Sequence, residues 1–177
     1  MLKINIRQMS LVSLFAALTS IGAFISIPLY PIPITLQTLF TLLAGMTLGS
    51  VLGAISQIIY VLLGVIGLPI FSGFTAGAGV LFGPTGGYLF GFIIASYIIG
   101  KMVELKREKN IFYYILAGLS GTVIIYILGV TQLSLVTGIG LKKALIVGMF
   151  PFLPGDFLKI LAASFIAIKL KKAINLK

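Results

Sequence analysis

Asp156 and Lys159 are the two residues whose types and spacing could do chemistry within an otherwise apolar stretch of this sequence. They lie three residues apart, so a helix would place the carboxylate and the ammonium group on one face. A charge inside a bilayer costs roughly 2.5–3.5 kcal/mol, and such residues usually line a cavity and have a task. The pair could therefore bind a polar ligand, or it could be a structural ion pair that holds two helices together.

The carboxylate could accept two N–H groups, and the ammonium group could meet a carbonyl or a carboxylate. Pro154 and Gly155 directly precede Asp156 and predict a helix start or break there. Such a break would expose free backbone N–H groups toward an anionic or carbonyl group. These groups suit recognition of a small molecule rather than its chemical conversion.

Several function classes are excluded by what the sequence lacks. It has no Cys, no His and only three carboxylates, so we expect no metal and no cofactor. No nucleophile–base pair is visible, which disfavours an enzyme. No Gly-rich phosphate-binding motif ending in Gly-Lys-Ser or Gly-Lys-Thr occurs, so active transport would need a partner ATPase or an ion gradient.

The composition is that of an integral membrane protein. The 177 residues are 59% hydrophobic and 9% charged, with a mean hydropathy of +1.21, whereas soluble domains are about 25% charged. The net charge of +10 comes mostly from short basic clusters flanking apolar spans, without the interleaved aromatics of a nucleic-acid surface. We therefore expect a lipid bilayer, and no nucleic acid, around the protein.

The apolar pattern predicts an all-α fold with six transmembrane helices in one compact bundle, forming a single domain over residues 1–177. A helix over the whole apolar run 34–70 would be about 55 Å long, far beyond a hydrocarbon core of about 30 Å. That run must hold two spans, with a turn near residues 45–53. The other spans are expected at about 10–27, 86–100, 111–131 and 145–168.

Charge placement predicts that both termini are cytoplasmic. With six spans, ten of the thirteen basic residues face the cytoplasm, as the positive-inside rule prefers. Lys159 then lies in the membrane, and Lys142 and Lys143 lie outside as exceptions to the rule. Asp156 falls in the outer half of the last span.

A glycine-rich stretch at 67–88 is too rich in Gly and Pro for a spanning helix and too apolar for a solvated linker. It predicts an outer loop or lid between the third and fourth helices, over a chamber that also includes the 28–33 loop. Phe71, Phe74, Phe82 and Tyr88 are expected to line this chamber. The candidate binding residues are Asp156, Lys159, Phe74, Thr75, Tyr88, Gln37 and Thr35; for Thr35 and Gln37, helix capping is an equally good interpretation.

Small residues form a ridge on the first span. Ser13 and Ala17 are four residues apart, as are Ala16 and Ser20. Ridges of this kind let another helix approach closely. The partner could be a helix of the same bundle or a separate membrane subunit.

Four segments occur in the order typical of one family: Pro31-Ile32-Pro33-Ile34-Thr35-Leu36-Gln37-Thr38, Gly67-Leu68-Pro69-Ile70-Phe71, Gly83-Pro84-Thr85-Gly86-Gly87-Tyr88 and Pro151-Phe152-Leu153-Pro154-Gly155-Asp156 with Lys159. Together they resemble BioY, the biotin-binding S component of energy-coupling factor (ECF) transporters, over essentially the whole chain. Phe74 and Ala76 stand where glycines are common in that family.

The resemblance implies a six-helix subunit in a bacterial or archaeal cell membrane that binds biotin from outside with high affinity. It implies a transmembrane T subunit and two ATP-binding A subunits as partners, with Asp156 and Lys159 as ligand contacts and the small-residue ridge as the docking surface. An S component for another vitamin, or an assembly subunit without a ligand, are the alternatives.

Overall fold

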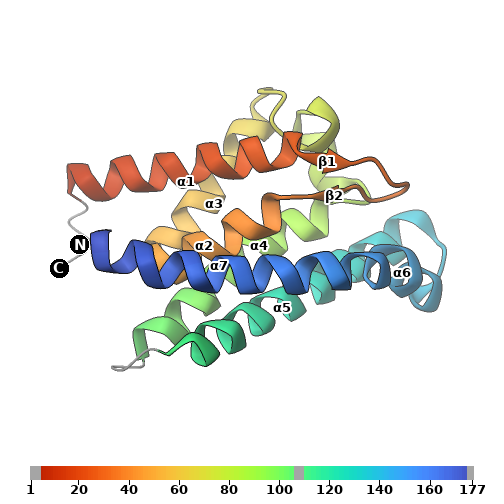
Figure 1. Cartoon of the computed structure of the whole chain (residues 1–177). Coiled ribbons are helices and arrows are strands. Elements are labelled where there is room, and N and C mark those ends of the chain that lie inside the picture. The colour runs from red at the N-terminus through yellow and green to blue at the C-terminus, as the bar shows by residue number, and fades with distance from the viewer. Residues whose placement is uncertain (1–4, 106–109, 175–177) are drawn as a thin grey trace.

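The computed structural model describes residues 5–105 and 110–174, and these residues are almost entirely helical. The elements in chain order are α1 (Ile6–Phe24), β1 (Ser26–Ile27), β2 (Ile34–Thr35), α2 (Gln37–Leu48), α3 (Ser50–Val65), the 3₁₀ helices η1 (Ser72–Phe74) and η2 (Ala78–Phe82), α4 (Gly86–Leu105), α5 (Ile111–Thr137), α6 (Leu141–Gly148), the 3₁₀ helix η3 (Phe150–Phe152) and α7 (Leu153–Ile174). The start of α1 and the end of α7 lie at one end of the bundle, here called the terminal end (Figure 1). The β1–β2 hairpin and α6 lie at the opposite end, called the loop end.

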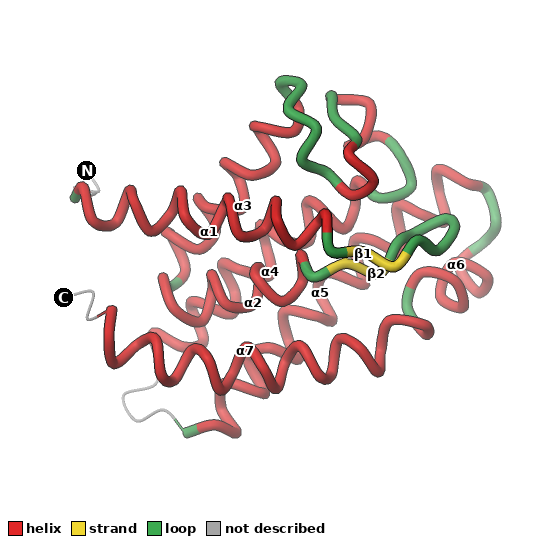
Figure 2. The backbone as a smooth tube through the Cα atoms, turned by 45° about the horizontal axis from the view of Figure 1, so that its top comes forward, coloured by secondary structure: helices red, strands yellow, loops and turns green. Residues whose placement is uncertain are grey.

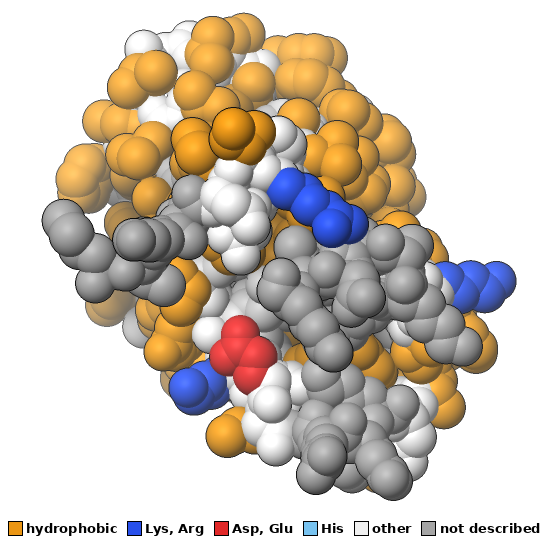
Figure 3. Space-filling model, turned by 90° about the vertical axis from the view of Figure 1, so that its left-hand side faces the viewer, with side chains coloured by type: hydrophobic (Ala, Val, Ile, Leu, Met, Phe, Trp, Pro, Cys, Tyr) orange, Lys and Arg blue, Asp and Glu red, His pale blue; other side chains and the backbone are white. Residues whose placement is uncertain are grey.

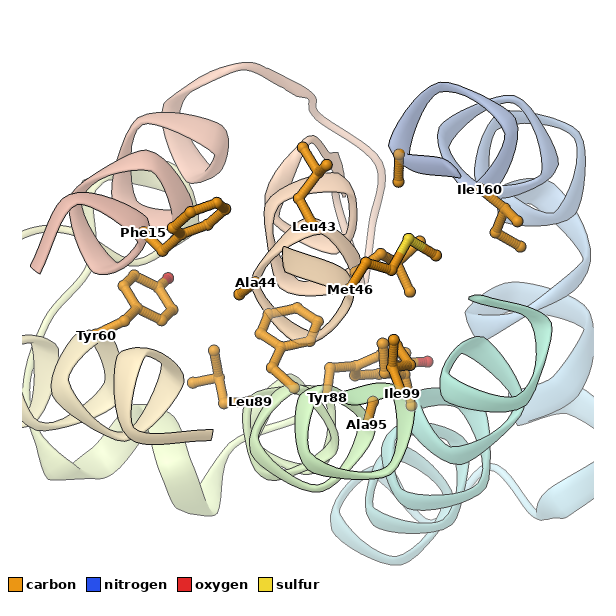
Figure 4. Close-up of a cluster of buried hydrophobic side chains, with 14 of the residues drawn as sticks. Phe15, Leu43, Ala44, Met46, Tyr60, Tyr88, Leu89, Ala95, Ile99 and Ile160 are labelled. Carbon is orange, nitrogen blue, oxygen red and sulfur yellow. The ribbon is translucent and has the colours of Figure 1, made fainter. Parts of the chain in front are cut away.

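Helix α2 is the centre of the bundle. It contacts α1, α3, α4, α5 and α7, and every residue from Thr41 to Leu48 is buried. Figure 4 shows Leu43, Ala44 and Met46 of α2 among side chains of the surrounding helices. A helix that is apolar on all sides in this way is a core helix, because it has no face left for solvent or lipid.

Four helical stretches are long and apolar enough to cross a membrane: Ile6–Phe24, Gly86–Leu105, Ile111–Thr137 and Leu141–Leu170. The chain is therefore a multi-pass membrane protein. The apolar helices α2 and α3 have 12 and 16 residues, about 18 and 24 Å at 1.5 Å per residue, which is short of a hydrocarbon core of about 30 Å. The run 34–70 holds two helices, as predicted; α2 begins toward the loop end, and α3 returns toward it.

The turn between α2 and α3 is at Gly49, within the predicted range, and has a positive φ of 86°. The carboxylate of Glu104 on α4 closes this turn, since it accepts hydrogen bonds from the Ser50 N–H at 2.6 Å and from the Ser50 hydroxyl. This contact satisfies a free N–H group at the start of α3. Figure 3 shows basic and acidic side chains at separate places on this terminal end of the bundle.

The loop end differs from the prediction in two ways. Ser26 and Ile27 are not helical but pair with Thr35 and Ile34 in a short antiparallel hairpin (Figure 2). The predicted last span, 145–168, is two helices, because η3 separates α6 from α7. Pro151 causes this break, since it has no N–H to donate and its ring clashes with the preceding turn.

The remaining boundaries differ less. The first helix begins at Ile6 and ends at Phe24 instead of covering 10–27, α4 continues to Leu105, and α5 continues to Thr137. The glycine-rich stretch contains no complete spanning helix, as predicted; it holds η1 and η2, and its last three residues begin α4.

A substitution at Gly100 of α4 tests how closely α4 packs against the α2–α3 turn. A Cβ atom there would lie 2.3 Å from the backbone C of Gly49 and the N of Ser50. Backbone atoms cannot rotate away, so we expect Gly100→Ala to destabilise the protein by about 1–3 kcal/mol and to lower its thermal unfolding temperature in detergent.

Gly155→Ala is the matched control, because a Cβ atom there meets nothing within 4 Å and alanine favours a helix. Its unfolding temperature should equal or exceed that of the wild type. Equal stability of the two variants would contradict this account of the turn.

Candidate functional site

A cavity of about 450 Å³ lies at the loop end, where α2 begins and α3 ends. It is lined by Pro31, Ile32, Pro33, Thr35, Gln37, Thr38, Phe71, Ser72, Thr75, Gly79, Val80, Gly83, Pro84, Thr85, Tyr88, Leu89, Phe92, Phe152, Asp156 and Lys159. The 28–33 loop, the glycine-rich stretch and the start of α7 thus meet at one cavity, as predicted. Its walls are mostly apolar with a few polar groups, the usual design of a small-molecule site.

Asp156 and Lys159 form a buried ion pair on one wall. The Lys159 Nζ lies 2.8 Å from the Asp156 Oδ1, and the two residues are 8% and 4% exposed. The Thr38 hydroxyl on α2 bridges the pair, since it donates to Asp156 Oδ1 at 3.2 Å and accepts from Lys159 at 3.0 Å. The ion pair therefore also joins α7 to the central helix.

Tyr126 of α5 completes this network. Its hydroxyl donates a hydrogen bond to the Asp156 Oδ2. A carboxylate offers about four acceptor positions and an ammonium group three donors. Asp156 thus keeps about one acceptor position, on Oδ2, and Lys159 keeps one N–H for a ligand.

Because α7 begins at Leu153, the Asp156–Lys159 pair lies near the start of this helix. Asp156 lies in the first turn of α7, where free N–H groups and the helix dipole stabilise a negative charge. Lys159 follows three residues later on the same face. The sequence predicted this helix start from Pro154 and Gly155.

A second polar chain runs along the start of α2. The Thr35 hydroxyl donates to the side-chain oxygen of Gln37 at 2.9 Å, and the Gln37 amide donates to the Tyr60 hydroxyl at 2.6 Å. Tyr60 in turn donates to the Ile70 carbonyl at 3.3 Å. Gln37 is held in one orientation by these bonds and keeps one N–H and one acceptor position free.

The glycine-rich stretch covers the cavity from the side of α3. Phe71 packs so closely on Gly64 that a Cβ atom there would lie 2.1 Å from its ring. The Thr75 hydroxyl donates to the Ser72 carbonyl at 3.0 Å, closing a tight turn. The hydroxyl of Ser72 is buried without a hydrogen-bond partner among the described residues. Because Ser72 lines the cavity, this hydroxyl can form a hydrogen bond with a ligand.

Tyr88 contributes its ring, rather than its hydroxyl, to the wall of the cavity. The ring packs on Gly129, and the hydroxyl donates to the Gly148 carbonyl at the end of α6 at 2.8 Å. This bond satisfies a carbonyl that the helix end leaves free. Tyr88 therefore fixes α6 and forms an apolar wall of the cavity.

Six of the seven candidate binding residues line the cavity: Asp156, Lys159, Thr75, Tyr88, Gln37 and Thr35. Phe74 does not; it is 67% exposed, and its ring stacks on Phe24 with centroids 4.7 Å apart. Phe82, also expected in the chamber, is 78% exposed and outside the lining. Other residues of η1 and η2, Ser72 and Val80 among them, line the cavity instead.

Tyr126 and Ser72 belong to the site but were not predicted from the sequence. Tyr126 lies in a long apolar span, 30 residues before Asp156, and nothing in the local pattern connects the two. Ser72 is one of many small residues in the glycine-rich stretch. Only the folded chain shows that both reach the same site.

The four residues of the predicted small-residue ridge on α1 do not all lie on the same side of the bundle surface: some are exposed and one is buried. Ser13 and Ala17 are exposed and Ser20 is half-buried, whereas Ala16 is only 2% exposed and packs into the core. An outer helix could therefore contact Ser13 and Ala17, but Ala16 belongs to the bundle.

Removing one partner of the ion pair should lower the stability of the protein more than removing both partners. Lys159→Met leaves a buried carboxylate without its cation, which costs about 3–5 kcal/mol in soluble proteins. We expect a clear drop in the unfolding temperature of the ligand-free protein. The double variant Asp156→Asn/Lys159→Met should recover much of that loss, since no unpaired charge remains. A double variant less stable than Lys159→Met alone would contradict the ion pair.

Comparison with known proteins places this chain in a family. The BioY family profile matches residues 1–176. The biotin transporter BioY of Thermotoga maritima is 45% identical over 166 residues, or 94% of this chain and 96% of that protein. A probable biotin transporter BioY of Pyrococcus horikoshii is 43% identical, over 93% of this chain and 96% of that one. The crystal structure of the S-component for biotin from an ECF-type ABC transporter superposes with a TM-score of 0.86 at 30% identity, covering 94% of this chain and 92% of that one. The chain belongs to the BioY family.

Proposed function

We propose that this protein binds biotin in the loop-end cavity and takes it up as the substrate-specific S component of an ECF-type transporter. The observation that carries the proposal is a mostly apolar cavity of about 450 Å³ with one buried carboxylate and one buried ammonium group, in a member of the BioY family. Relatives named as biotin transporters support it.

The polar groups of biotin match the hydrogen-bond donor and acceptor positions that remain free in the site. Its cyclic urea has two N–H donors and a carbonyl acceptor, its thioether ring is apolar, and its side chain ends in a carboxylate. Asp156 has an acceptor position for an N–H group, while Lys159 has a proton for a carbonyl or a carboxylate. Phe71, Phe92 and the ring of Tyr88 offer apolar walls for the rest of the molecule.

The proposed polar contacts are Asp156, Lys159, Thr35, Gln37 and Thr75, with Thr38 and Ser72 added from the lining of the cavity. Thr38 both orients the ion pair and keeps an acceptor position of its own. Tyr126 holds Asp156 from behind the cavity wall. Phe74 is not included, because its ring lies outside the lining.

In the proposed topology, α1 to α5 and the combined α6–α7 segment form six spans in one domain, with both termini cytoplasmic. The cavity then opens to the outside of a bacterial or archaeal cell membrane. A subunit of this kind is not an enzyme, and the sequence has no motif for binding ATP. Energy would come from a transmembrane T subunit and ATP-binding A subunits.

The exposed face of α1 that contains Ser13 and Ala17 is the proposed docking surface for the T subunit. Both residues are small, exposed and one helical turn apart, so a partner helix can approach closely. Ser20 continues this surface, whereas Ala16 is covered by the bundle.

Binding of labelled biotin to the purified protein tests the function directly. We expect high affinity for the wild type, and at least a tenfold weaker affinity for Asp156→Asn, because the amide replaces an ionised acceptor. Phe74→Ala should bind like the wild type. Micromolar or weaker affinity for biotin together with tighter binding of another vitamin would reject biotin as the substrate.

Larger side chains on α1 test the docking surface separately. Ser13→Leu/Ala17→Leu should leave biotin binding unchanged and abolish co-purification with the T and A subunits, because the added branches hold the partner helix away. Thr131→Leu is the control, since Thr131 is exposed on α5 outside the proposed surface. Normal assembly of the α1 variant would exclude this face.

A further inference from the structure

A groove of about 470 Å³ adjoins the cavity at the loop end. It is lined by Tyr30, Pro31, Thr137, Ile139, Lys143, Ile146 and Val147. Pro31 lines both the groove and the cavity, so one backbone segment separates them. In Figure 1, the hairpin loop that contains Tyr30 and Pro31 and the connection between α5 and α6 lie at the same end of the molecule.

Lys142 and Lys143, on α6 beside this groove, have no structural task that the fold explains. Both are exposed, and neither makes a hydrogen bond or an ion pair within 5–105 and 110–174. They lie in the first turn of α6, where the helix dipole disfavours a positive charge by roughly 0.3–1 kcal/mol. In the proposed topology they also lie on the outer side, against the positive-inside rule.

These two lysines give the loop end its net charge. Asp156 and Lys159 neutralise each other, and the other charged side chains that the structure describes, Arg7, Lys101, Glu104 and Lys169, lie toward the terminal end. Lys143 in the groove and Lys142 beside it are therefore positive charges that no described acidic side chain neutralises. Clefts with charges of one sign and walls of low dielectric constant concentrate ions of the opposite sign and raise association rates by about 10- to 1000-fold.

We infer that Lys142 and Lys143 form a cationic entrance, in which the carboxylate of the incoming ligand is captured in the groove before the ligand passes Pro31 into the cavity. The inference rests on the proposed function, because biotin carries one negative charge at neutral pH. Lys143 lines the groove and would contact the carboxylate, while Lys142 adds to the field. The entrance acts on the rate of association, whereas the cavity residues set the rate of dissociation.

The association rate constant of biotin, measured by rapid mixing with the ligand-free full-length protein in nanodiscs of zwitterionic lipid, tests this inference. At an ionic strength of about 0.01 M, where charges act over about 30 Å, Lys142→Gln/Lys143→Gln should lower the rate constant about tenfold. At about 1 M, where the range is about 3 Å, the variant and the wild type should agree. The dissociation rate constant should not change.

Arg7→Gln/Lys101→Gln is the matched control, because it removes the same charge from exposed positions at the terminal end. It should associate like the wild type, and biotin methyl ester, which is neutral, should associate at a rate independent of salt. Equal slowing by both double variants, or an unchanged rate for the lysine variant, would overturn the entrance while the proposed function stands. Absence of biotin binding by the wild type would overturn both.

Discussion

The short central helix α2 is the constraint on which the rest of the molecule depends. Its 12 residues span about 18 Å, so roughly 12 Å of a 30 Å hydrocarbon core remains beyond its first turn. Five helices contact it, and the cavity lies at its first turn, lined by residues of α2, α4 and α7 and of the loops around them. Irregular backbone at this depth is tolerated only where it is buried or lines a cavity, and both the 31–35 segment and the η1–η2 segment line this one.

The polar groups of the site follow from the same constraint. The beginning of α2 leaves N–H groups and side chains without helical partners, and Thr38 and Gln37 lie there. Their bonds to the Asp156–Lys159 pair and to Tyr60 satisfy groups that would be costly to bury alone. The same bonds hold the side chains in place before a ligand arrives, so less ordering is needed on binding.

The two ends of the bundle differ in how they treat charge. At the terminal end, Glu104 closes the α2–α3 turn and the packing is close enough to require glycine at position 100. At the loop end, the buried charges are paired, whereas the exposed lysines of α6 have no ion-pair partner in the part of the chain that the structure describes. A rigid base and a mouth with free positive charge are what a subunit needs if it holds a small anion in a fixed site and collects it from solution.

The sequence by itself determined the membrane character, the division of the chain into apolar helices, a turn within residues 45–53, the helix start before Asp156 and the family. These features depend on composition, on helix length against bilayer thickness, and on Gly and Pro, all of which act locally. Only the tertiary structure decided that Phe74 and Ala16 do not face where the pattern suggested, and that Tyr126 and Thr38 hold the carboxylate of Asp156. The direction of a side chain depends on how helices distant in sequence rotate and pack against one another, and an almost uniformly apolar helix carries little periodic signal for that rotation.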